Sequence, residues 1–316
     1  MTKLFSIIIT AYNRDRYVKY AINSVLSQTL KDYEIIIVTN LNIPGLSNTI
    51  KIIYDNNEYL GEKIYKGFSE SEGYIICFLD DDDMFRVDKL ERVNSLFRFF
   101  KGTIYYHNNF TTIDDKGHEI RVKEDYLKVP PYASLSTLSY PIILEHTYTA
   151  NIKYLKRLNA NFNSSSICVS KEVINENVKY LRRIKAIIDS FLFYSSLKME
   201  GKILLDPERL TYYRIHNFQT SSGSTQGVNE YKKSLSNLFI KALEDSYVIK
   251  EMLGNNDIVD EDIITYFLLY KIFSRRKIKC DLKLNKSTLK YFILSIMPYF
   301  IREIYIKGQF NRRSRY

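Results

Sequence analysis

Short runs of consecutive apolar residues alternate with amphipathic stretches along the first third of the chain. The runs have the length and β-branched content of buried strands and comprise residues 5–9 (FSIII), 34–38 (EIIIV), 50–54 (IKIIY) and 73–79 (GYIICFL). Residues 15–28 follow the first run and place apolar residues at helical spacing, and residues 60–71 resemble a second helix. Buried strands that alternate with helices predict an α/β fold around a mainly parallel sheet.

The middle of the chain continues this pattern less regularly. The sequence predicts a helix over 86–100 and further strands at 103–108, 166–170, 202–206 and 210–216. Residues 109–165 are polar and contain Pro130, Pro131 and Pro141. Because such a length is unusual for a connection without regular structure, we expect a functional insertion there.

A change of composition marks the end of this region. Residues 217–229 (NFQTSSGSTQGVN) are typical of a flexible loop. We therefore expect one domain over residues 1–222 and a helical C-terminal region over 223–316. Within the latter, apolar residues between 289 and 304 recur at three- and four-residue steps, which predicts an amphipathic helix. Its densest apolar run is too short to span a bilayer.

The positive charge of the chain is concentrated at its end. The 316 residues carry a net charge of +10, while residues 271–316 alone contain thirteen Lys/Arg against two acids. A basic segment with an apolar stripe fits a helix attracted to an anionic membrane surface. It also fits a helix packed on the main domain with a solvated basic tip. No nucleic-acid partner is expected, because no recognisable nucleic-acid-binding module accompanies the charge.

The cysteines and the N-terminus bear on the cellular compartment. Cys77, Cys168 and Cys280 are far apart, odd in number and without a CxxC pair, so we expect free thiols in a reducing compartment. The N-terminus MTKLFSIII lacks the shape of a signal peptide. We therefore expect a cytoplasmic protein.

Four consecutive aspartates, Asp80 to Asp83, follow the fourth strand-like run. Carboxylates favour a helix N-terminus, but that preference explains one or two of them and not four. A calcium loop of the EF-hand type is rejected, because Met84 and Phe85 stand where a ligand and a glycine are needed. The carboxyl ends of parallel strands are the ligand-binding edge of such a sheet. We therefore expect Mg²⁺ or Mn²⁺ held by carboxylates together with substrate phosphates.

Three stretches together resemble the family 2 glycosyltransferases, which have the GT-A fold. They are SIIITAYNRDRYVKYAINSVLSQTLKDYEIIIV, GYIICFLDDDD and IIDSFLFYSSLKMEGKILLDPERLTYYRIHNFQTSS. The family has Thr/Ala-Tyr-Asn after the first strand, a helix that ends in Ser-Val-Leu-x-Gln-Thr, Leu-Asp-x-Asp-Asp, and later Tyr-Tyr-Arg-x-His. The spacing of Gly67 and Gly73 before the aspartates also fits, and the resemblance covers residues 4 to about 222.

The resemblance implies an inverting, metal-dependent transfer of a sugar from a nucleoside-diphosphate sugar. Asp82 and His216 are expected to bind Mn²⁺ or Mg²⁺, and Asp83 to support the metal or the donor sugar. Asp189 is expected to be the general base that deprotonates the acceptor hydroxyl. The residues expected to bind the donor nucleotide are Thr10, Ala11, Tyr12, Asn13, Arg14, Asn40, Lys66, Asp80, Asp81 and Arg214.

The resemblance also implies an acceptor, and with it a location. The acceptor is expected to be a glycan or a polyprenyl-linked saccharide. The enzyme is then expected to sit peripherally on the cytosolic face of a membrane.

Two departures from the family pattern concern the donor nucleotide. Where the family has Val-Asp-Asp-Gly-Ser after the second strand, this chain has Val-Thr-Asn-Leu-Asn, so Asn40 replaces an acid that contacts uracil. The family's Arg-Asn is replaced by Ile64–Tyr65, and Lys63 or Lys66 is a candidate for the lost positive charge. The donor therefore stays open between UDP, GDP and dTDP sugars.

Two other functions are compatible with parts of the sequence. A sugar-1-phosphate nucleotidyltransferase shares the sheet and an acidic metal site, but TAYNRDRY is not its glycine-rich phosphate loop. A catalytically degenerate relative that binds only nucleotide or lipid would explain the two departures. The retained Asp82, Asp189, Arg214 and His216 argue against it.

Overall fold

The computed structural model describes residues 3–121, 135, 138–145, 152–216, 226–254, 256–274 and 288–313. The chain divides into two compact units, Met1–Arg214 and Ile215–Tyr316, and each has a hydrophobic core of its own. The domain boundary expected at residue 222 lies outside the described residues.

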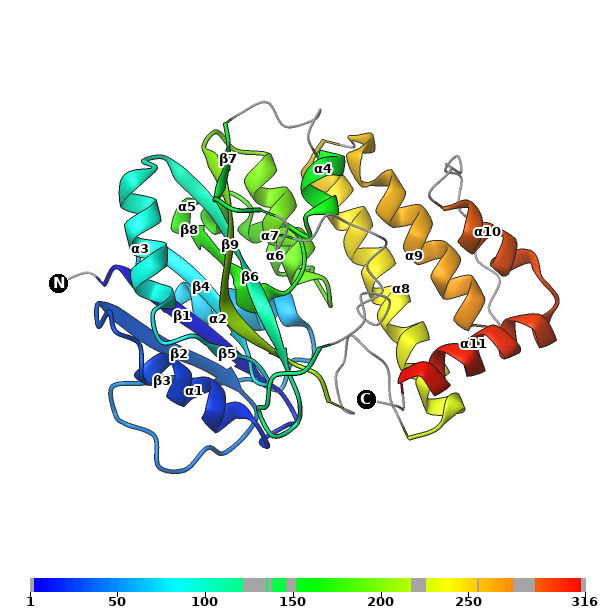
Figure 1. The fold of residues 1–316 in the computed structure, drawn as a ribbon, viewed down its shortest axis with the longest axis horizontal. Helices are drawn as coiled ribbons and strands as arrows, with labels where there is room; N and C mark the ends of the chain where they lie inside the picture. The colour runs from blue at the N-terminus through cyan, green and yellow to red at the C-terminus, as the bar shows by residue number, and fades with distance from the viewer. Residues whose placement is uncertain are drawn as a thin grey trace. The chain divides into compact units, whose positions relative to one another are not determined.

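A mixed sheet forms the centre of the first unit (Figure 1). Its strands are β1 (Phe5–Ala11), β2 (Tyr33–Thr39), β3 (Lys51–Tyr54), β4 (Ile75–Asp80), β5 (Met84–Phe85), β6 (Thr103–Ile113), β7 (Ile142–Leu144), β8 (Ile167–Ser170) and β9 (Lys202–Arg214). They lie in the order β3-β2-β1-β4-β8-β6-β9-β5, and β7 pairs with β9. The first four are parallel, whereas β8 runs antiparallel to β4 and to β6. The predicted α/β fold with a mixed sheet is confirmed.

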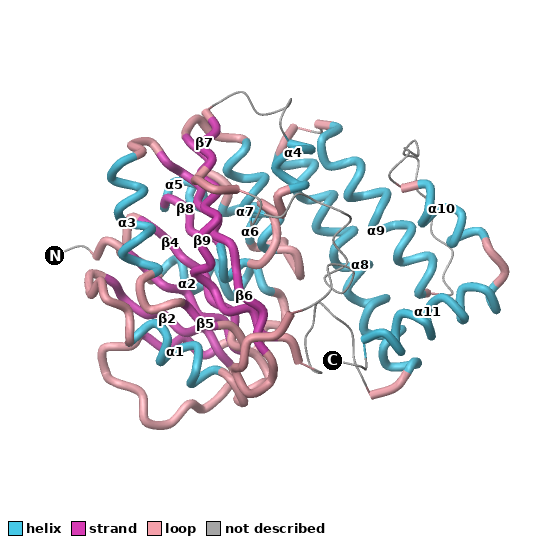
Figure 2. The backbone as a smooth tube through the Cα atoms, viewed as in Figure 1, coloured by secondary structure: helices cyan, strands magenta, loops and turns pink. Residues whose placement is uncertain are grey.

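Helices cover the two faces of this sheet (Figure 2). The helices of this unit are α1 (Val18–Leu26), α2 (Leu60–Ser69), α3 (Lys89–Phe99), α4 (Ile152–Arg157), α5 (Lys171–Asn175), α6 (Val178–Leu181) and α7 (Ile188–Leu197). Successive residues of a strand point to opposite faces. Ile7 and Ile9 of β1 join the core formed with α1 and α3, while Ile8 faces α2. Every residue of β1 is therefore buried, which explains its uninterrupted apolar sequence.

Two glycines allow α2 and the turn after it to approach the sheet closely. A Cβ atom at Gly67 would lie 2.7 Å from Cγ2 of Ile8 and 3.2 Å from Cγ2 of Val38. At Gly73 it would lie 2.5 Å from backbone atoms of Phe5 and Ser6. The N–H of Gly73 also donates to Oγ of Ser6 at 2.8 Å. The two glycines that the sequence analysis singled out are thus explained by packing.

The far half of the sheet differs in detail from the prediction. Strand β6 continues to Ile113, and β9 runs without interruption through Pro207. Their parallel register shifts between the pairs Asn108–Asp206 and Asn109–Arg209, so a bulge at Pro207 keeps both predicted strands in one ladder. Within 109–165, β7 and α4 are regular elements, and residues 122–134, 136–137 and 146–151 lie outside the described residues.

The expectation of free thiols is wrong for two of the cysteines. Cys77 and Cys168 are directly opposite each other in the antiparallel pair of β4 and β8, and they form a disulfide. The sequence gives no sign of this pairing, because it depends on β8 entering the sheet next to β4 in antiparallel orientation. Cys280 lies outside the described residues.

The second unit is helical. It contains α8 (Val228–Met252), α9 (Asp260–Phe273), α10 (Leu289–Ile296) and α11 (Tyr299–Arg313). Its core includes Tyr231 and Phe239 of α8, Phe273 of α9 and Ile306 of α11. Within the described ranges, none of the helices combines the length and the apolar character that crossing a membrane requires.

The close approach at Gly73 leads to a test of the packing. Gly73→Ala is expected to lower the free energy of unfolding of the first unit by about 1–3 kcal/mol, because the new methyl group meets backbone that cannot yield. Gly308→Ala is the matched control, since a Cβ atom there meets nothing within 4 Å and alanine favours the helix. Thermal unfolding followed by circular dichroism measures both, and an unchanged melting temperature for Gly73→Ala would contradict the packing.

Candidate functional site

The four aspartates lie at the carboxyl edge of the parallel half of the sheet. Asp80 is the last residue of β4, where it is in register with Thr10 of β1, and the next three residues form the turn that leads into β5. The N–H of Asp83 closes this turn by donating to the carbonyl oxygen of Asp80 at 3.2 Å. Strand β5 then pairs with β9, so the acidic turn is held between two strands of the same sheet.

Three of these carboxylates can bind one cation. Asp80, Asp82 and Asp83 each offer an oxygen, and these oxygens lie within 4.8 Å of one another. One oxygen of Asp83 is buried without a hydrogen-bond partner. Burial and the neighbouring Asp82 raise the pKa of Asp80 to about 6 and that of Asp83 well above its ordinary value. A buried, mutually repelling set of oxygens fits Mg²⁺ or Mn²⁺, which prefer carboxylate ligands.

Arginine side chains and backbone groups hold the acidic turn in place. Arg14 forms an ion pair with Asp81, and its Nη1 lies 3.1 Å from Oδ2 of Asp82. Arg214 at the end of β9 donates its backbone N–H to Asp83 at 2.9 Å and its side-chain Nε to the carbonyl oxygen of Asp82 at 2.9 Å. Both arginines were predicted to bind the donor, and the structure places both against the acidic run. Their contact with a diphosphate stays a prediction.

A short turn before β8 supports the other side of the aspartates. Oγ of Ser164 donates to Oδ2 of Asp80 at 2.8 Å, and the backbone N–H of Asp80 donates to Oγ of Ser165 at 3.1 Å. The fully buried Lys89 also stabilises this turn, because its Nζ donates to the carbonyl oxygen of Ser165 at 2.6 Å. None of these three supporting residues was predicted from the sequence.

Asp189 lies on the other side of the same turn. It occupies the first turn of α7 and accepts N–H groups from Ser190 at 2.8 Å and from Asn163 at 3.2 Å. Because Asn163 directly precedes Ser164, one dipeptide bonds both the predicted base and the first aspartate of the run. Burial raises the pKa of Asp189 to about 6, although the two N–H groups act in the opposite direction. A carboxylate with such a pKa is suited to accept a proton near neutral pH.

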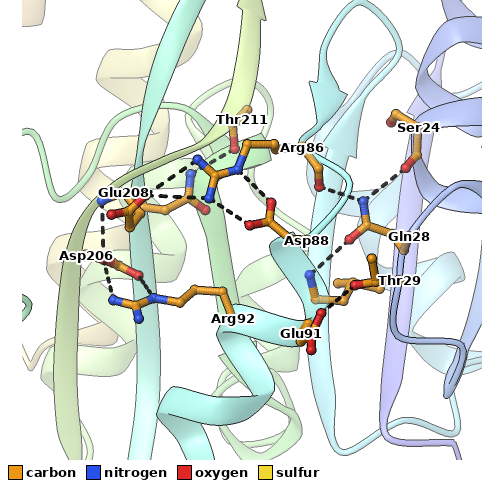
Figure 3. A network of polar contacts seen from close by, with 12 residues as sticks. Ser24, Gln28, Thr29, Arg86, Asp88, Glu91, Arg92, Asp206, Glu208 and Thr211 are labelled. Atoms are coloured by element: carbon orange, nitrogen blue, oxygen red, sulfur yellow. Dashed lines mark hydrogen bonds and ion pairs between the residues drawn. The ribbon is translucent and has the colours of Figure 1, made fainter.

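Gln28 and Thr29, just beyond α1, hold the chain that follows the aspartates by hydrogen bonds (Figure 3). Nε2 of Gln28 donates to the carbonyl oxygens of Ser24 at 3.0 Å and Arg86 at 2.7 Å, and its Oε1 accepts the N–H of Leu90 at 3.0 Å. Thr29 donates to Glu91 at 2.8 Å. The Ser-Val-Leu-x-Gln-Thr motif of the sequence is therefore the device that fixes where the acidic turn passes into α3.

The predicted nucleotide-binding residues at the ends of β1 and β2 lie side by side. Thr10 and Ala11 end β1, and Ala11 is in register with Thr39. Asn13 has a positive φ of 57°. Its backbone N–H donates to Oδ1 of Asn40 at 2.9 Å, and Nδ2 of Asn40 donates to Oδ1 of Asn13 at 2.6 Å. The structure thus brings the two strand ends together. Whether these residues bind nucleotide stays a prediction.

A third strand end contributes groups that were not expected. Asp55 follows β3 and accepts from Lys66 of α2 at 2.9 Å. Lys63, one turn earlier on α2, lies with its Nζ 3.9 Å from the centre of the Tyr12 ring. Lys66 was predicted as a nucleotide-binding residue, and Asp55 was missed. The rule that identified Asp80, a carboxylate directly after a buried strand, applies equally to Asp55.

His216 lies two residues beyond β9, in the second unit, and it is buried. The carboxylate set that can hold a cation consists of Asp80, Asp82 and Asp83, and His216 is not one of its members. Its role as a metal ligand stays a prediction.

Comparisons with known proteins agree on one family. The model of glycosyl transferase family 2 matches residues 6–178. An uncharacterized glycosyltransferase of Nostoc sp. is 28% identical over 237 residues, which span 71% of this chain and 69% of the relative. One from Rickettsia typhi is 26% identical over 84% of this chain and 80% of its own length. The solved structure of S. aureus TarS 1–349 in complex with UDP-GlcNAc superposes with a TM-score of 0.51 at 11% identity and covers 85% of this chain and 81% of that chain. At 11% identity, the likeness to TarS shows a shared fold and nothing more.

The raised pKa values predict how a cation acts on stability. Without a metal, the folded state keeps a proton on Asp80 up to pH about 6, and the pKa of Asp83 is also raised well above its ordinary value, whereas the unfolded state loses both protons near pH 4. These groups therefore destabilise the fold as the pH rises through this window, and a cation must displace their protons. The rise in melting temperature caused by Mn²⁺ is expected to grow between about pH 5 and 8.

Differential scanning fluorimetry with and without Mn²⁺ measures this rise. Asp82→Ala is expected to abolish it. Asp88→Ala is expected to keep it, because Asp88 pairs with Arg86 and is not part of the carboxylate set. A rise that does not depend on pH, or that survives in Asp82→Ala, would contradict the site.

Proposed function

The chain belongs to glycosyl transferase family 2, and on that premise we propose that it moves a sugar from a nucleoside-diphosphate sugar to an acceptor hydroxyl with inversion at the anomeric carbon. One observation carries the proposal. The Asn163–Ser164 dipeptide hydrogen-bonds Asp189 on one side and Asp80 of the cation-binding set on the other. A base and a phosphate-binding centre are thereby held on the same rigid turn. The complex of TarS with UDP-GlcNAc supports a donor of this class.

The residues that would hold a divalent cation are Asp80, Asp82 and Asp83. Mn²⁺ or Mg²⁺ bound there would neutralise the negative charge of the leaving diphosphate. Arg14 contributes a further positive charge beside Asp81 and Asp82. The fold thus fixes Arg14 and the carboxylates that would hold the cation before a donor arrives, and such preorganised groups favour charge development on a leaving group.

Asp189 is the candidate general base. Its carboxylate is oriented by the N–H groups of Ser190 and Asn163, and it lies near enough to Asp80 to contribute to the raised pKa of that residue. One ionised carboxylate suffices for a direct displacement, in which it takes the acceptor proton while the sugar bond to the diphosphate breaks. A direct displacement inverts the anomeric configuration.

Two alternatives are less well supported. A nucleotidyltransferase is disfavoured by the match to glycosyl transferase family 2 over residues 6–178. A degenerate relative that only binds nucleotide would not need an ordered carboxylate, yet Asp189 is held by two N–H groups.

We propose a glycan or a polyprenyl-linked saccharide as the acceptor class.

The base assignment predicts a separation of binding from catalysis. Asp189→Asn is expected to lower the rate of sugar transfer about 10²–10⁴-fold, because the amide cannot accept the acceptor proton. Binding of the nucleoside diphosphate is expected to survive. In the wild type the rate is expected to fall below pH about 6, where Asp189 becomes protonated.

Transfer assays with radiolabelled nucleotide sugars and calorimetric titration of the nucleotide measure the two effects. Glu172→Gln is the control, since Glu172 is an exposed acid in the first turn of another helix, α5. Full transfer activity in Asp189→Asn would refute the role of this residue.

We further propose that the second unit contacts an anionic membrane, which would place the enzyme peripherally on the cytosolic face. Large apolar side chains of α10 and α11 are exposed, namely Leu289, Ile293, Ile296, Phe300 and Ile304. Lys290 and Lys307 are exposed on the same helices. Apolar side chains together with a basic segment supply the two signals that a stable interfacial helix needs.

Vesicle flotation tests this contact. The protein is expected to float with phosphatidylcholine vesicles that contain phosphatidylglycerol, and not with phosphatidylcholine alone. Replacing Ile296, Phe300 and Ile304 with serine is expected to weaken the binding at least about tenfold. Serine at Tyr74, Val87 and Phe99, which are exposed in the first unit, is the control. Equal flotation of the two triple variants would contradict the assignment.

A further inference from the structure

One carboxylate oxygen of Asp55 is buried without a hydrogen-bond partner, and the buried side chain of Lys63 lies close by, over the ring of Tyr12. The side chain of Asp55 belongs to a residue that is only 8% exposed, and its Oδ2 atom has no hydrogen-bond partner. Lys63 is 4% exposed, and its Nζ lies 3.9 Å from the centre of the Tyr12 ring. Leaving a buried carboxylate oxygen unsatisfied is costly, so its position beside a buried lysine points to a ligand.

Both groups belong to the edge of the sheet that carries the proposed donor site. The N–H of Asp55 donates to the carbonyl oxygen of Thr39 at 2.9 Å, at the end of β2. The hydroxyl of Tyr12, just beyond β1, donates to the carbonyl oxygen of Asn56 at 3.2 Å. Nζ of Lys63 lies over the Tyr12 ring and senses the charges of both Asp55 and Asp81. Asp55 and Lys63 therefore lie at the same edge of the sheet as the acidic turn.

Only one oxygen of Asp55, Oδ2, lacks a hydrogen-bond partner within the protein. Its Oδ1 already accepts Nζ of Lys66 at 2.9 Å and the N–H of Asn57 at 2.9 Å. A single free carboxylate oxygen matches one N–H donor. The imide of uracil or thymine presents one N–H between two carbonyl oxygens. Guanine presents two parallel N–H groups, which need both carboxylate oxygens, and cytosine presents an acceptor at the same ring position.

We propose that Asp55 reads the imide N–H of a uracil-type base and that Lys63 meets a carbonyl oxygen of that base. This inference rests on the proposed function and narrows its donor to a uridine or thymidine diphosphate sugar. The acid that reads the base thus follows the third strand of the sheet. Asn40, which follows the second strand, is occupied by its paired hydrogen bonds with Asn13.

Replacing the carboxylate with an amide tests the reading directly. In Asp55→Asn, Lys66 and the N–H of Asn57 keep the amide oxygen at the Oδ1 position, because both are donors. The amide NH₂ then occupies the Oδ2 position and offers a donor where the carboxylate offered an acceptor. That donor repels the imide of uracil and fits the ring nitrogen of cytosine.

The experiment is calorimetric titration of UDP, dTDP, CDP and GDP in the presence of Mn²⁺. The wild type is expected to bind UDP or dTDP about 10- to 100-fold more tightly than CDP and GDP. In Asp55→Asn, the preference for UDP and dTDP over CDP and GDP is expected to fall about 10- to 100-fold, and the affinity for CDP is expected to rise. Glu70→Gln, an exposed acid-to-amide change at the end of α2, is expected to behave as the wild type.

The outcomes separate this inference from the proposed function. A wild type that binds GDP best, or an Asp55→Asn variant that keeps the preference for UDP over CDP, overturns the inference and leaves a nucleotide-binding enzyme. A wild type that binds none of the four nucleotides overturns both. If Asp55→Asn fails to fold, the ranking measured on the wild type still decides. The comparison of UDP with dTDP shows which of the two bases the site accepts.

Discussion

Four adjacent carboxylates at the end of one buried strand are the constraint around which the first unit is organised. Asp81, Asp82 and Asp83 are each at most 8% exposed, so their mutual repulsion is little screened by water. Groups from distant parts of the sequence offset this repulsion. They are Arg14 after β1, Ser164 in the turn before β8, and Arg214 at the end of β9. Each group donates hydrogen bonds or positive charge to the turn. Burial and repulsion nevertheless raise the pKa of Asp80 and of Asp83, and we propose that a bound cation offsets the remaining repulsion.

The chemistry of the site follows from which elements meet at that turn. A sheet of parallel strands collects strand ends at one edge, and here those ends carry an aspartate run, an amide pair and an isolated carboxylate. The antiparallel entry of β8 brings the Asn163–Ser164 dipeptide to the same edge, and with it Asp189 of α7. One short turn therefore positions both Asp189, the proposed base, and Asp80 of the carboxylate set that can hold a cation. This explains how two residues more than a hundred positions apart are held in fixed geometry.

The sequence predicted what depends on local pattern, and it missed what depends on pairing between distant segments. The strand ends, the aspartate run and Asp189 could be identified because apolar periodicity and the family motifs are local signals. The disulfide of Cys77 with Cys168 could not, because it requires knowing that β8 lies antiparallel to β4. The support given by Ser164 spans 84 residues and has no local signature. Asp55 differs from both, since its position after a strand was visible and only its burial and unpartnered oxygen were not.

The measurement that tests the central claim most directly is the configuration of the first-formed sugar product, followed by proton NMR. The enzyme would be supplied with α-linked nucleotide sugars, Mn²⁺ and a saccharide acceptor. A single carboxylate base next to a cation-binding set predicts that the transferred sugar first appears in the β configuration. First appearance of the α configuration would require a second displacement, and it would contradict the assignment of Asp189 as the base of a direct transfer.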